Sequence, residues 1–343
     1  MTPLPVSTFD LRRHSPPWYS SAPMLPTLAD VHTAHERIAR QIRRTPLLES
    51  DALSERCGGR VFLKCESLQR AGAFKIRGAL NAVLLARETG RLPNAGVVTY
   101  SSGNHGQAVA LAAKLSGVPA VIVVPEDILL VKKRAIESHG ARVVACGKTS
   151  EERRVRGEAI AHETGALVIP PFDDADIIAG QGTVAVEILG EAPEVDVILV
   201  PVGGGGLIAG VALASRALKP SVEVWGVEPD TADSLRQALH RGGPVTIPSS
   251  TSVADGLRAV RTGVLCYEAA RRFVHGVVTV SDDEILAAQR FLLEEAKLFV
   301  EPSGATAAAP LLSGDKTFNG RTVAVVLSGG NAEIGESLLP ANG

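Results

Sequence analysis

One lysine, Lys75, stands where a glycine-containing turn meets a helix-forming run, in the stretch Ser67–Gly78 (SLQRAGAFKIRG). A lysine at a helix entrance lies near the positive end of the helix dipole, where a cation is disfavoured. The neutral amine is therefore easier to reach, and a neutral lysine amine is a nucleophile toward carbonyls. The alternative is a surface lysine that begins a helix, which is the commoner place for this residue type. Three other loops decide between these interpretations.

The first of these loops is Ser101–Gly106 (SSGNHG), between a strand-like run and a helical run. Hydroxyls, a glycine and the free N–H groups of a helix start form a cradle that suits a carboxylate. An ordinary N-cap turn explains the same residues. His105 is interpreted as structural, because no partner for a catalytic imidazole is evident.

The second loop is Val200–Gly210 (VPVGGGGLIAG), which runs from strand to glycines to helix. Four consecutive glycines allow backbone amides to close on a phosphate at the helix N-terminus. The run also matches GxGxxA, and Glu228 ends the next strand where a ribose-binding acid would lie, so a nicotinamide oxidoreductase stays an alternative.

The third loop is Leu327–Asn331 (LSGGN), whose Ser328 faces a ring nitrogen or a sugar, or caps a helix.

Composition excludes several classes of protein. At 343 residues the chain favours two domains, and a hydrophobic content of 45% supports a sizeable core. Lys plus Arg number 35 and Asp plus Glu 37, so no field favours nucleic acid or a membrane surface. No apolar run reaches the length of a membrane span. Neither a nucleic acid nor a membrane is therefore an expected partner.

Cysteine usage and the N-terminus indicate a cytoplasmic protein. The four cysteines show no CxxC spacing, so neither a zinc site nor a disulfide framework is indicated. Cys65 is interpreted as a buried packing thiol rather than a nucleophile. Residues 1–26 contain six prolines and no apolar h-region, so they predict an irregular, disordered arm and not a signal peptide.

The elements that must position the four loops form a repeated βα pattern, which predicts parallel sheets with crossover helices. Expected strands are Val61–Glu66, Val97–Ser101, Val118–Pro125, Ala141–Cys146, Leu167–Pro171, Val195–Val202, Val222–Val227, Val277–Ser281 and Val323–Leu327. Expected helices are Leu28–Arg43, Asn104–Ser116, Leu130–Ser138, Glu151–Glu163, Leu207–Ala217, Ala232–His240 and Asp282–Ala296. The predicted fold is two open, mostly parallel, twisted α/β domains, with the site in the cleft at the carboxyl ends of the strands.

Taken in this order, the four loops resemble those of the fold-type II pyridoxal-phosphate enzymes, in the threonine/serine dehydratase and serine racemase group. The resemblance runs from about Thr27 to the end. It includes Thr45-Pro-Leu, Gly180-Gln-Gly-Thr183, Ala254-Asp-Gly256 and Glu301-Pro-Ser-Gly304. It implies a large cofactor-binding domain (27–84 and 173–343), a small mobile α/β domain (85–172) and a homodimer.

The resemblance also implies residue roles. Lys75 forms a Schiff base with the aldehyde of pyridoxal 5'-phosphate, and Phe74 packs beside the ring. Asn104 hydrogen-bonds the ring hydroxyl, and Ser328 meets the ring nitrogen. The phosphate is held by Gly203, Gly204, Gly205, Gly206 and Leu207. The substrate carboxylate is surrounded by Ser101, Ser102, Gly103 and His105.

The implied reaction is β-elimination of a small hydroxy amino acid, L-serine or L-threonine, to a 2-oxo acid and ammonia. Many threonine dehydratases have alanine in place of Ser102, whereas serine racemase has a serine that acts as acid and base opposite the lysine. Serine racemase is therefore an alternative, as are lyases for 3-hydroxyaspartate or phenylserine. A non-catalytic cofactor-binding protein is the remaining one.

The stretch Glu228–Ser234 is similar to the divalent-cation loop of serine racemase. The resemblance implies a Mg²⁺ or Ca²⁺ site made by Glu228, the carbonyl of Ala232 and Ser234, at the place where that family has an aspartate. The alternative is a helix start without a metal.

Overall fold

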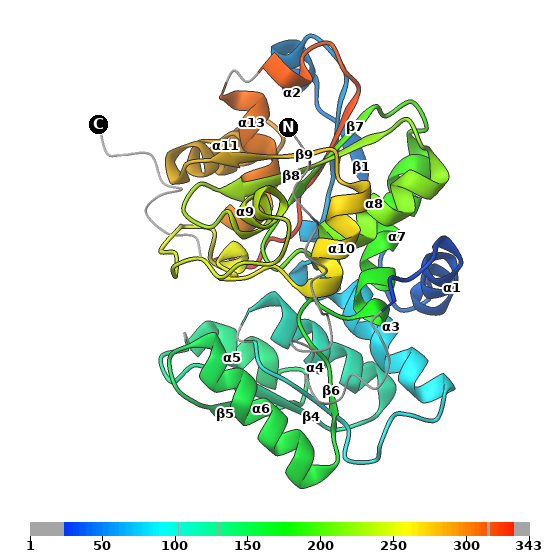
Figure 1. Ribbon diagram of the computed structural model, residues 1–343, viewed down its shortest axis with the longest axis vertical. Coiled ribbons are helices and arrows are strands. Elements are labelled where there is room, and N and C mark those ends of the chain that lie inside the picture. Colours follow the sequence, from blue (N-terminus) through cyan, green and yellow to red (C-terminus); the bar gives the residue numbers. More distant parts are fainter. Residues whose placement is uncertain (1–23, 102, 129, 314–315, 333–343) are drawn as a thin grey trace, which may run out of the picture.

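The computed structural model describes residues 24–101, 103–128, 130–313 and 316–332. The fold contains two sheets, which lie one after the other along the long axis of the molecule (Figure 1). The larger has six strands, in the order β1 (Leu47–Glu49), β2 (Val61–Lys64), β10 (Val323–Val326), β7 (Val197–Pro201), β8 (Glu223–Pro229) and β9 (Gly276–Val280). All neighbours in it are parallel except β1 and β2.

The smaller sheet has four parallel strands, in the order β5 (Arg142–Ala145), β4 (Ala120–Val124), β3 (Val97–Thr99) and β6 (Leu167–Val168). Its strands come from one continuous segment, while the chain before and after that segment builds the larger sheet. The predicted fold class, two mostly parallel α/β layers, is confirmed. The domain boundaries at residues 84 and 172, and the mobility of the smaller domain, stay predictions.

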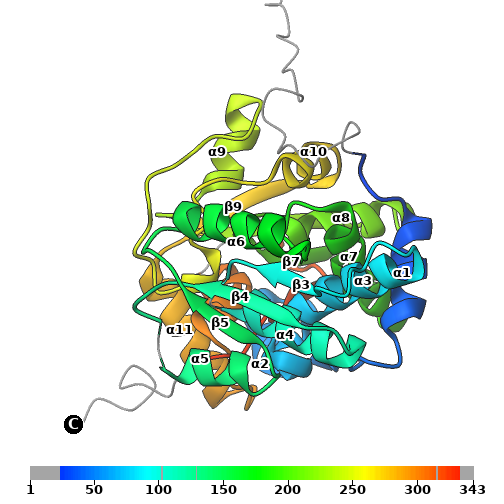
Figure 2. The same ribbon diagram turned by 90° about the horizontal axis from the view of Figure 1, so that it is seen from below.

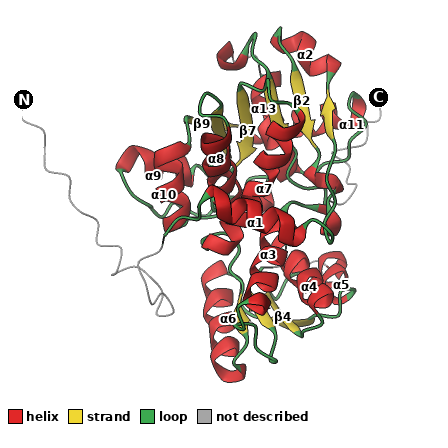
Figure 3. Ribbon diagram, turned by 90° about the vertical axis from the view of Figure 1, so that its right-hand side faces the viewer, coloured by secondary structure: helices red, strands yellow, loops and turns green. Residues whose placement is uncertain are grey.

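The helices are α1 (Leu28–Ile38), α2 (Asp51–Cys57), α3 (Lys75–Glu88), α4 (Asn104–Ser116), α5 (Leu130–Glu137), α6 (Ser150–Thr164), α7 (Ala175–Glu191), α8 (Gly206–Leu218), α9 (Ser234–Arg241), α10 (Val264–Phe273), α11 (Asp282–Glu294), α12 (Pro302–Ala305) and α13 (Ala309–Leu312). Figure 2 shows α6 on one face of the smaller sheet and α4 with α5 on the other. Figure 3 shows α1, α3 and α7 between the two sheets. The helix that begins with Lys75 therefore lies at the junction.

Apolar runs explain why the central strands form. Every residue of β7 and of β10 is buried, as expected for parallel strands covered on both faces. Their side chains enter two cores, one on each face of the larger sheet. The central strands thus give a rigid edge from which the loops at their carboxyl ends project.

The structure corrects several predicted elements. Helix α7, with 17 residues, was not predicted, because 12 of them are buried and the segment lacks a polar face with helical period. The helices α2 and α10 were missed as well. Strand β6 ends at Val168 rather than Pro171, because the chain leaves the smaller sheet there to cross to α7. Helix α1 ends at Ile38 and not at Arg43.

Residues 1–23 of the predicted arm lie outside the described residues. Among the residues that the structure does describe, no helix combines the length and the apolar character needed to cross a membrane.

Candidate active site

Lys75 is the first residue of α3, as the sequence predicted, and its side chain is partly buried. Its Nζ donates to the carbonyl of Pro171 at 2.8 Å and lies 5.1 Å from the centre of the Phe74 ring. Burial lowers the pKa of the Lys75 amine from 10.5 to about 8. A sizeable neutral fraction is therefore present near pH 8, and the neutral form is the nucleophile.

Three helix N-termini at this place lack a side-chain cap among the described residues, namely those of α3, α4 and α8. By contrast, α1, α6 and α11 each carry a capping box, and α2 and α7 are capped by the side chains of Ser50 and Asp174. The N-termini of α9 and α10 are capped by carboxylates from other segments, Glu228 and Asp173. Uncapped N-terminal N–H groups are a ready site for an anion. The three open N-termini therefore mark the ligand-binding region.

The glycine loop fits a phosphate at the start of α8. Gly205 is the N-cap and has φ +96°, a left-handed conformation that favours glycine. A Cβ on Gly204 would lie 2.2 Å from the ring of Phe172, so a larger residue would clash with it. Gly206 and Leu207 open the helix, and Leu207 is 4% exposed. Backbone N–H groups without side chains in front of them suit a phosphate group.

The crossover between the sheets brings these N-termini together. His105 of α4 contacts the carbonyl of Ile169 through Nε2 at 3.1 Å. Lys75 holds the carbonyl of Pro171, and the ring of Phe172 packs on the glycine loop. Asp173 then accepts backbone N–H bonds from the first turn of α10 at 2.8 Å. The segment from Ile169 to Asp173 thus contacts three of the four predicted loops.

His105 is neutral in this arrangement. It is 2% exposed, and its pKa falls to about 3, mainly because of burial and then because of the Lys75 charge. A carbonyl only accepts hydrogen bonds, so Nε2 carries the proton, and Nδ1 has no partner among the described residues. Its observed contact is structural, as the local sequence suggested. A place beside the substrate carboxylate stays a prediction.

Asn104 belongs to a polar cluster that connects α4, which packs on the smaller sheet, to loops of the larger sheet. Its Nδ2 donates to Glu301 Oε1 at 2.6 Å, and its Oδ1 accepts from Asn331 Nδ2 at 2.8 Å. Asn331 Nδ2 also donates to the Ala71 carbonyl at 2.7 Å. Burial raises the pKa of Glu301 to about 7. We refer to Asn104, Glu301 and Asn331 as the Asn104 cluster.

Glu301 and Asn331 have no predicted role, although both lie in motifs that carry the family resemblance. Each is a carboxyl or amide side chain in an otherwise apolar loop next to a buried element. This pattern could have indicated a buried polar contact. Asp173 was likewise missed, because its partners lie more than ninety residues away in the unpredicted helix α10.

Ser328 follows β10 and is 4% exposed. Its carbonyl accepts from the N–H of Phe74 at 3.0 Å, which fastens this loop to the turn before Lys75. Ser101 and Gly103 precede α4, with Gly103 as its N-cap, whereas Ser102 lies outside the described residues. The loop residues predicted to meet the cofactor ring and the substrate thus border one region.

The residues of the predicted metal site lie at and just before the start of α9. Glu228 is 0% exposed, and its two carboxylate oxygens accept from the N–H groups of Leu235 and Arg236, both at 2.9 Å. The hydroxyl of Ser234 is paired with that of Thr262 at 3.0 Å, and Ala232 is buried in the preceding turn. No group of three or more His, Cys, Asp or Glu side chains gathers within the described ranges. The Glu228 carboxylate thus caps the N-terminus of α9, and a Mg²⁺ or Ca²⁺ site at these residues stays a prediction.

Comparison with known proteins identifies the family. Residues 38–329 match the family described as pyridoxal-phosphate dependent enzyme. The chain belongs to this family. The pyridoxal-phosphate enzymes it resembles include the L-threo-3-hydroxyaspartate ammonia-lyase of Saccharomyces cerevisiae, with 40% identity over 91% of this chain and 95% of the relative. Human serine racemase is 42% identical over 91% of this chain and 93% of its own.

Solved structures of pyridoxal-phosphate enzymes show the same fold. Maize serine racemase superposes with a TM-score of 0.87 at 39% identity, covering 91% of this chain and 95% of that one. The threonine deaminase of T.th. gives a TM-score of 0.85 at 41% identity, covering 90% of this chain and 100% of that one. The enzyme is thus of fold type II, in the group of serine racemases, threonine deaminases and hydroxyaspartate ammonia-lyases.

Family membership overturns the nicotinamide alternative. The glycine loop matches GxGxxA, but the expected ribose-binding acid, Glu228, is buried and engaged with the N-terminus of α9. It presents no free oxygen to a ribose. A dinucleotide is therefore no longer expected at the glycine loop, and its role in holding the phosphate of pyridoxal phosphate stays a prediction.

Proposed function

We propose that this enzyme is an ammonia-lyase that converts a small β-hydroxy amino acid, L-serine or L-threonine, to a 2-oxo acid and ammonia. The observation that carries the proposal is the Lys75 amine, with its pKa near 8, beside three open helix N-termini. A nucleophilic amine, a phosphate cradle and a carboxylate cradle are what pyridoxal phosphate and one amino acid require.

The residues that would hold the cofactor fit its chemistry. The N-terminus of α8, with Gly203–Leu207, receives the phosphate, and Ser328 offers the ring nitrogen a hydroxyl without a charge. Asn104 has a second N–H, beyond the one given to Glu301, for the ring hydroxyl. Lys75 supplies the amine for the aldehyde. Bound pyridoxal phosphate supplies an electron sink for the substrate's α-carbon.

Lys75 carries the proton steps. Once the substrate's amine has taken the place of Lys75 on the aldehyde, the freed Lys75 amine is the group that removes the α-proton. Its lowered pKa leaves roughly half of it neutral near pH 8. The α-proton and the β-hydroxyl leave together as water. The resulting enamine takes up one water when it hydrolyses to 2-oxo acid and ammonia, so the overall reaction balances without an oxidant.

The N-terminal turn of α4 orients the substrate. Its N-cap is Gly103, which leaves backbone N–H groups free for a carboxylate. Neutral His105 holds this turn against the crossover segment through Ile169. We expect a carboxylate held at this turn to direct the substrate's α-carbon toward Lys75, which is the positioning that β-elimination needs.

Serine racemisation is the second candidate, supported by the serine racemases of rice, Arabidopsis and human among the relatives at 40–42% identity. It needs an acid on the face opposite Lys75, and Ser102 is the residue proposed for it. The yeast relative is named as a lyase for L-threo-3-hydroxyaspartate. This substrate differs from L-serine and L-threonine only in the group attached to the β-carbon.

One assay separates these activities. The enzyme is incubated with L- and D-serine, L-threonine and L-threo-3-hydroxyaspartate, with and without Mg²⁺, and 2-oxo acid and product enantiomer are measured together. We expect 2-oxo acid from L-serine or L-threonine, with the rate unchanged by chelation. D-serine as the main product, lost in Ser102→Ala while elimination persists, would move the assignment to racemase. Turnover of hydroxyaspartate alone would overturn the proposed substrate class.

A further inference from the structure

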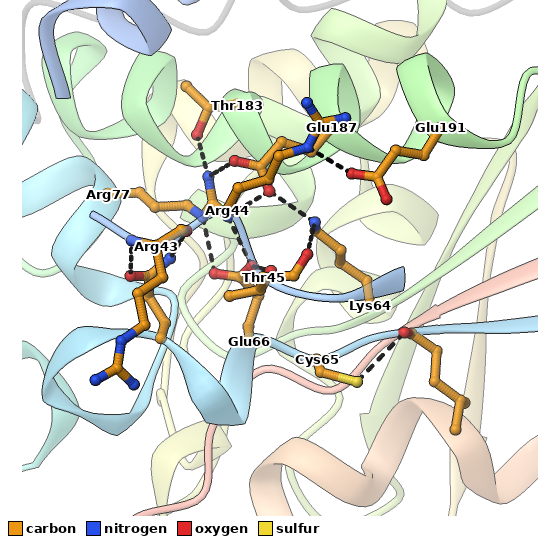
Figure 4. Close-up of polar contacts among 12 residues, drawn as sticks. Arg43, Arg44, Thr45, Lys64, Cys65, Glu66, Arg77, Thr183, Glu187 and Glu191 are labelled. Atoms are coloured by element: carbon orange, nitrogen blue, oxygen red, sulfur yellow. Dashed lines mark hydrogen bonds and ion pairs between the residues drawn. The ribbon is translucent and has the colours of Figure 1, made fainter. Parts of the chain in front are cut away.

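Arg77 lies two residues after Lys75 in the first turn of α3 and is 0% exposed. Its guanidinium grips Glu66 through Nε and Nη2, both at 2.8 Å, and Glu187 through Nη1 and Nη2, at 2.7 and 2.8 Å. Nη1 also donates to Thr183 Oγ1 at 3.0 Å. These five bonds occupy all five N–H donors of an arginine. Figure 4 shows Arg77 together with Thr183, Glu66 and Glu187.

Lys64 completes the group. Its Nζ donates to Glu187 Oε2 at 2.6 Å and to the Thr45 carbonyl at 2.7 Å. Two cations thus face two carboxylates, so the net charge is zero, and the four side chains are at most 2% exposed. We refer to Lys64, Glu66, Arg77 and Glu187 as the Arg77 cluster.

The Arg77 cluster joins three elements at the start of α3, the helix that begins with Lys75. Glu66 follows β2, and Glu187 lies on α7, which packs against α3. The two helices approach closely, because a Cβ on Gly180 would lie 2.6 Å from the carbonyl of Arg77. The first turn of α3 is therefore fixed against both the larger sheet and α7.

Stability alone does not explain the Arg77 cluster. Apolar side chains of similar volume often replace a buried ion pair without loss of stability. A cation in the first turn of a helix is disfavoured by the dipole, and α3 has no acidic residue in that turn to offset it. Compared with apolar side chains of similar volume, the Arg77 cluster provides two further properties, a fixed geometry and a fixed local charge.

We propose that Arg77, with Glu66 and Glu187, is a positioning residue for Lys75: the cluster fixes the first turn of α3 and keeps the buried region at the start of this helix electrically neutral. This inference rests on the proposed role of Lys75 as the cofactor-binding lysine. Arg77 touches neither cofactor nor substrate in it and acts only through the placement and electrostatic environment of Lys75.

The neutrality of the cluster has consequences of opposite sign. Arg77→Met leaves one cation and two carboxylates, a net charge of −1, which favours a protonated nitrogen at Lys75. Glu187→Gln leaves two cations and one carboxylate, a net charge of +1, which disfavours it. The titratable groups that face Lys75 from other elements are the Cys266 thiol of α10 and the His105 imidazole of α4. Both substitutions leave those groups in place.

The test uses the holoenzyme of the wild type, Arg77→Met, Arg77→Lys and Glu187→Gln. The visible absorbance of the lysine-bound cofactor is titrated with pH, and kcat and KM are measured. We expect the midpoint to rise in Arg77→Met and to fall in Glu187→Gln, each by up to about one pH unit. A misplaced lysine should lower kcat by roughly 10- to 100-fold, with KM changing much less. Arg77→Lys keeps the charge but loses the two-pronged contact, so kcat should fall without a shift of the midpoint.

A matched control is Leu53→Ala, which removes a buried side chain on α2, in a different core from the one beneath α3. It should lower thermal stability while leaving the midpoint and the kcat-to-KM pattern unchanged. Midpoints that do not move, or that move in the same direction in Arg77→Met and Glu187→Gln, would overturn the inference. If Arg77→Met does not fold, Glu187→Gln and Arg77→Lys decide it. Borohydride labelling of the wild type at a lysine other than Lys75 would instead overturn the proposed function.

Discussion

Two polar clusters flank the start of α3, one fully buried and one partly buried, and they are built in opposite ways. The Arg77 cluster is closed, because every guanidinium donor is paired and the charges sum to zero. The Asn104 cluster contains one carboxylate, Glu301, which accepts from the amide of Asn104 and makes no ion pair within salt-bridge distance among the described residues. The first cluster lies within the framework of the larger sheet, whereas the second spans from α4 of the smaller sheet to α12 and the end of β10.

The difference indicates that the two clusters have different roles, one in structural support and one in the pH dependence of the contact between the sheets. A change of charge in the Arg77 cluster would break its ion pairs. The cluster therefore gives the helix turn that carries Lys75 a rigid support. Glu301 changes its charge near neutral pH, because burial raises its pKa to about 7. Contact between the two sheets through Asn104 is therefore expected to depend on pH, whereas the placement of Lys75 on α3 is not.

The same substitution in the two clusters should have effects of different size and sign. Glu66→Gln removes one partner of a buried ion pair and places an amide N–H against the Arg77 guanidinium. Because this leaves Arg77 partly uncompensated, we expect a loss of about 3–5 kcal/mol in the free energy of unfolding at all pH values from about 6 to 9. Urea denaturation measures it. A loss below about 1 kcal/mol would show that the closed cluster is not a unit.

Glu301→Gln should leave stability near pH 5 nearly unchanged and raise it near pH 8. The folded-state pKa of Glu301, about 7, lies above its unfolded value of about 4.5, so the folded state holds an extra proton between these values. Stability from this group is fully present below pH 4.5 and declines as pH rises to 7, by up to about 3 kcal/mol. Glutamine keeps the acceptor for Asn104 and removes the titration.

Urea denaturation of wild type and Glu301→Gln at pH 5 and pH 8 tests this sign. The wild type should lose more stability between the two pH values than the variant does. Equal losses in the two proteins would mean that Glu301 is ionised throughout, which would remove the contrast between the clusters.

Asn331→Ala should give the smallest effect. It removes the donors to the Asn104 Oδ1 and the Ala71 carbonyl, at 2.8 and 2.7 Å. We expect a loss of about 1–2 kcal/mol in unfolding free energy, the usual range for partly buried hydrogen bonds, and weaker cofactor binding because Asn104 is less well held. Spectroscopic titration of the apoenzyme with pyridoxal phosphate measures the second effect. Unchanged affinity would place Asn331 outside the support of the cofactor site.

Local patterns allowed part of this structure to be predicted from the sequence. Helix α4 matches its predicted bounds, Asn104–Ser116, because glycines bracket it on both sides. The four loops were found because a strand, a small or glycine-rich turn and a helix succeed one another within a few residues. At these places neighbouring residues alone determine the local structure.

The two clusters were not predicted, for a physical reason. Glu187 is 110 residues from Arg77 and lies on α7, whose buried sequence hides its helical period. Glu301 is 197 residues from Asn104. A charged residue in an apolar helix signals a buried partner but does not say which, since the partner is set by how α3, α7 and the sheet pack. Positions far apart in the sequence therefore needed the structure.

The most direct test of the account is to find the lysine that binds pyridoxal phosphate. The holoenzyme is reduced with borohydride, digested with trypsin and mapped by mass spectrometry. Because modified Lys75 resists cleavage, we expect the cofactor on a peptide that runs from Ala71 to Arg77, while buried Lys64 stays unmodified. Cofactor found on another lysine, with Lys75 cleaved normally, would contradict the account.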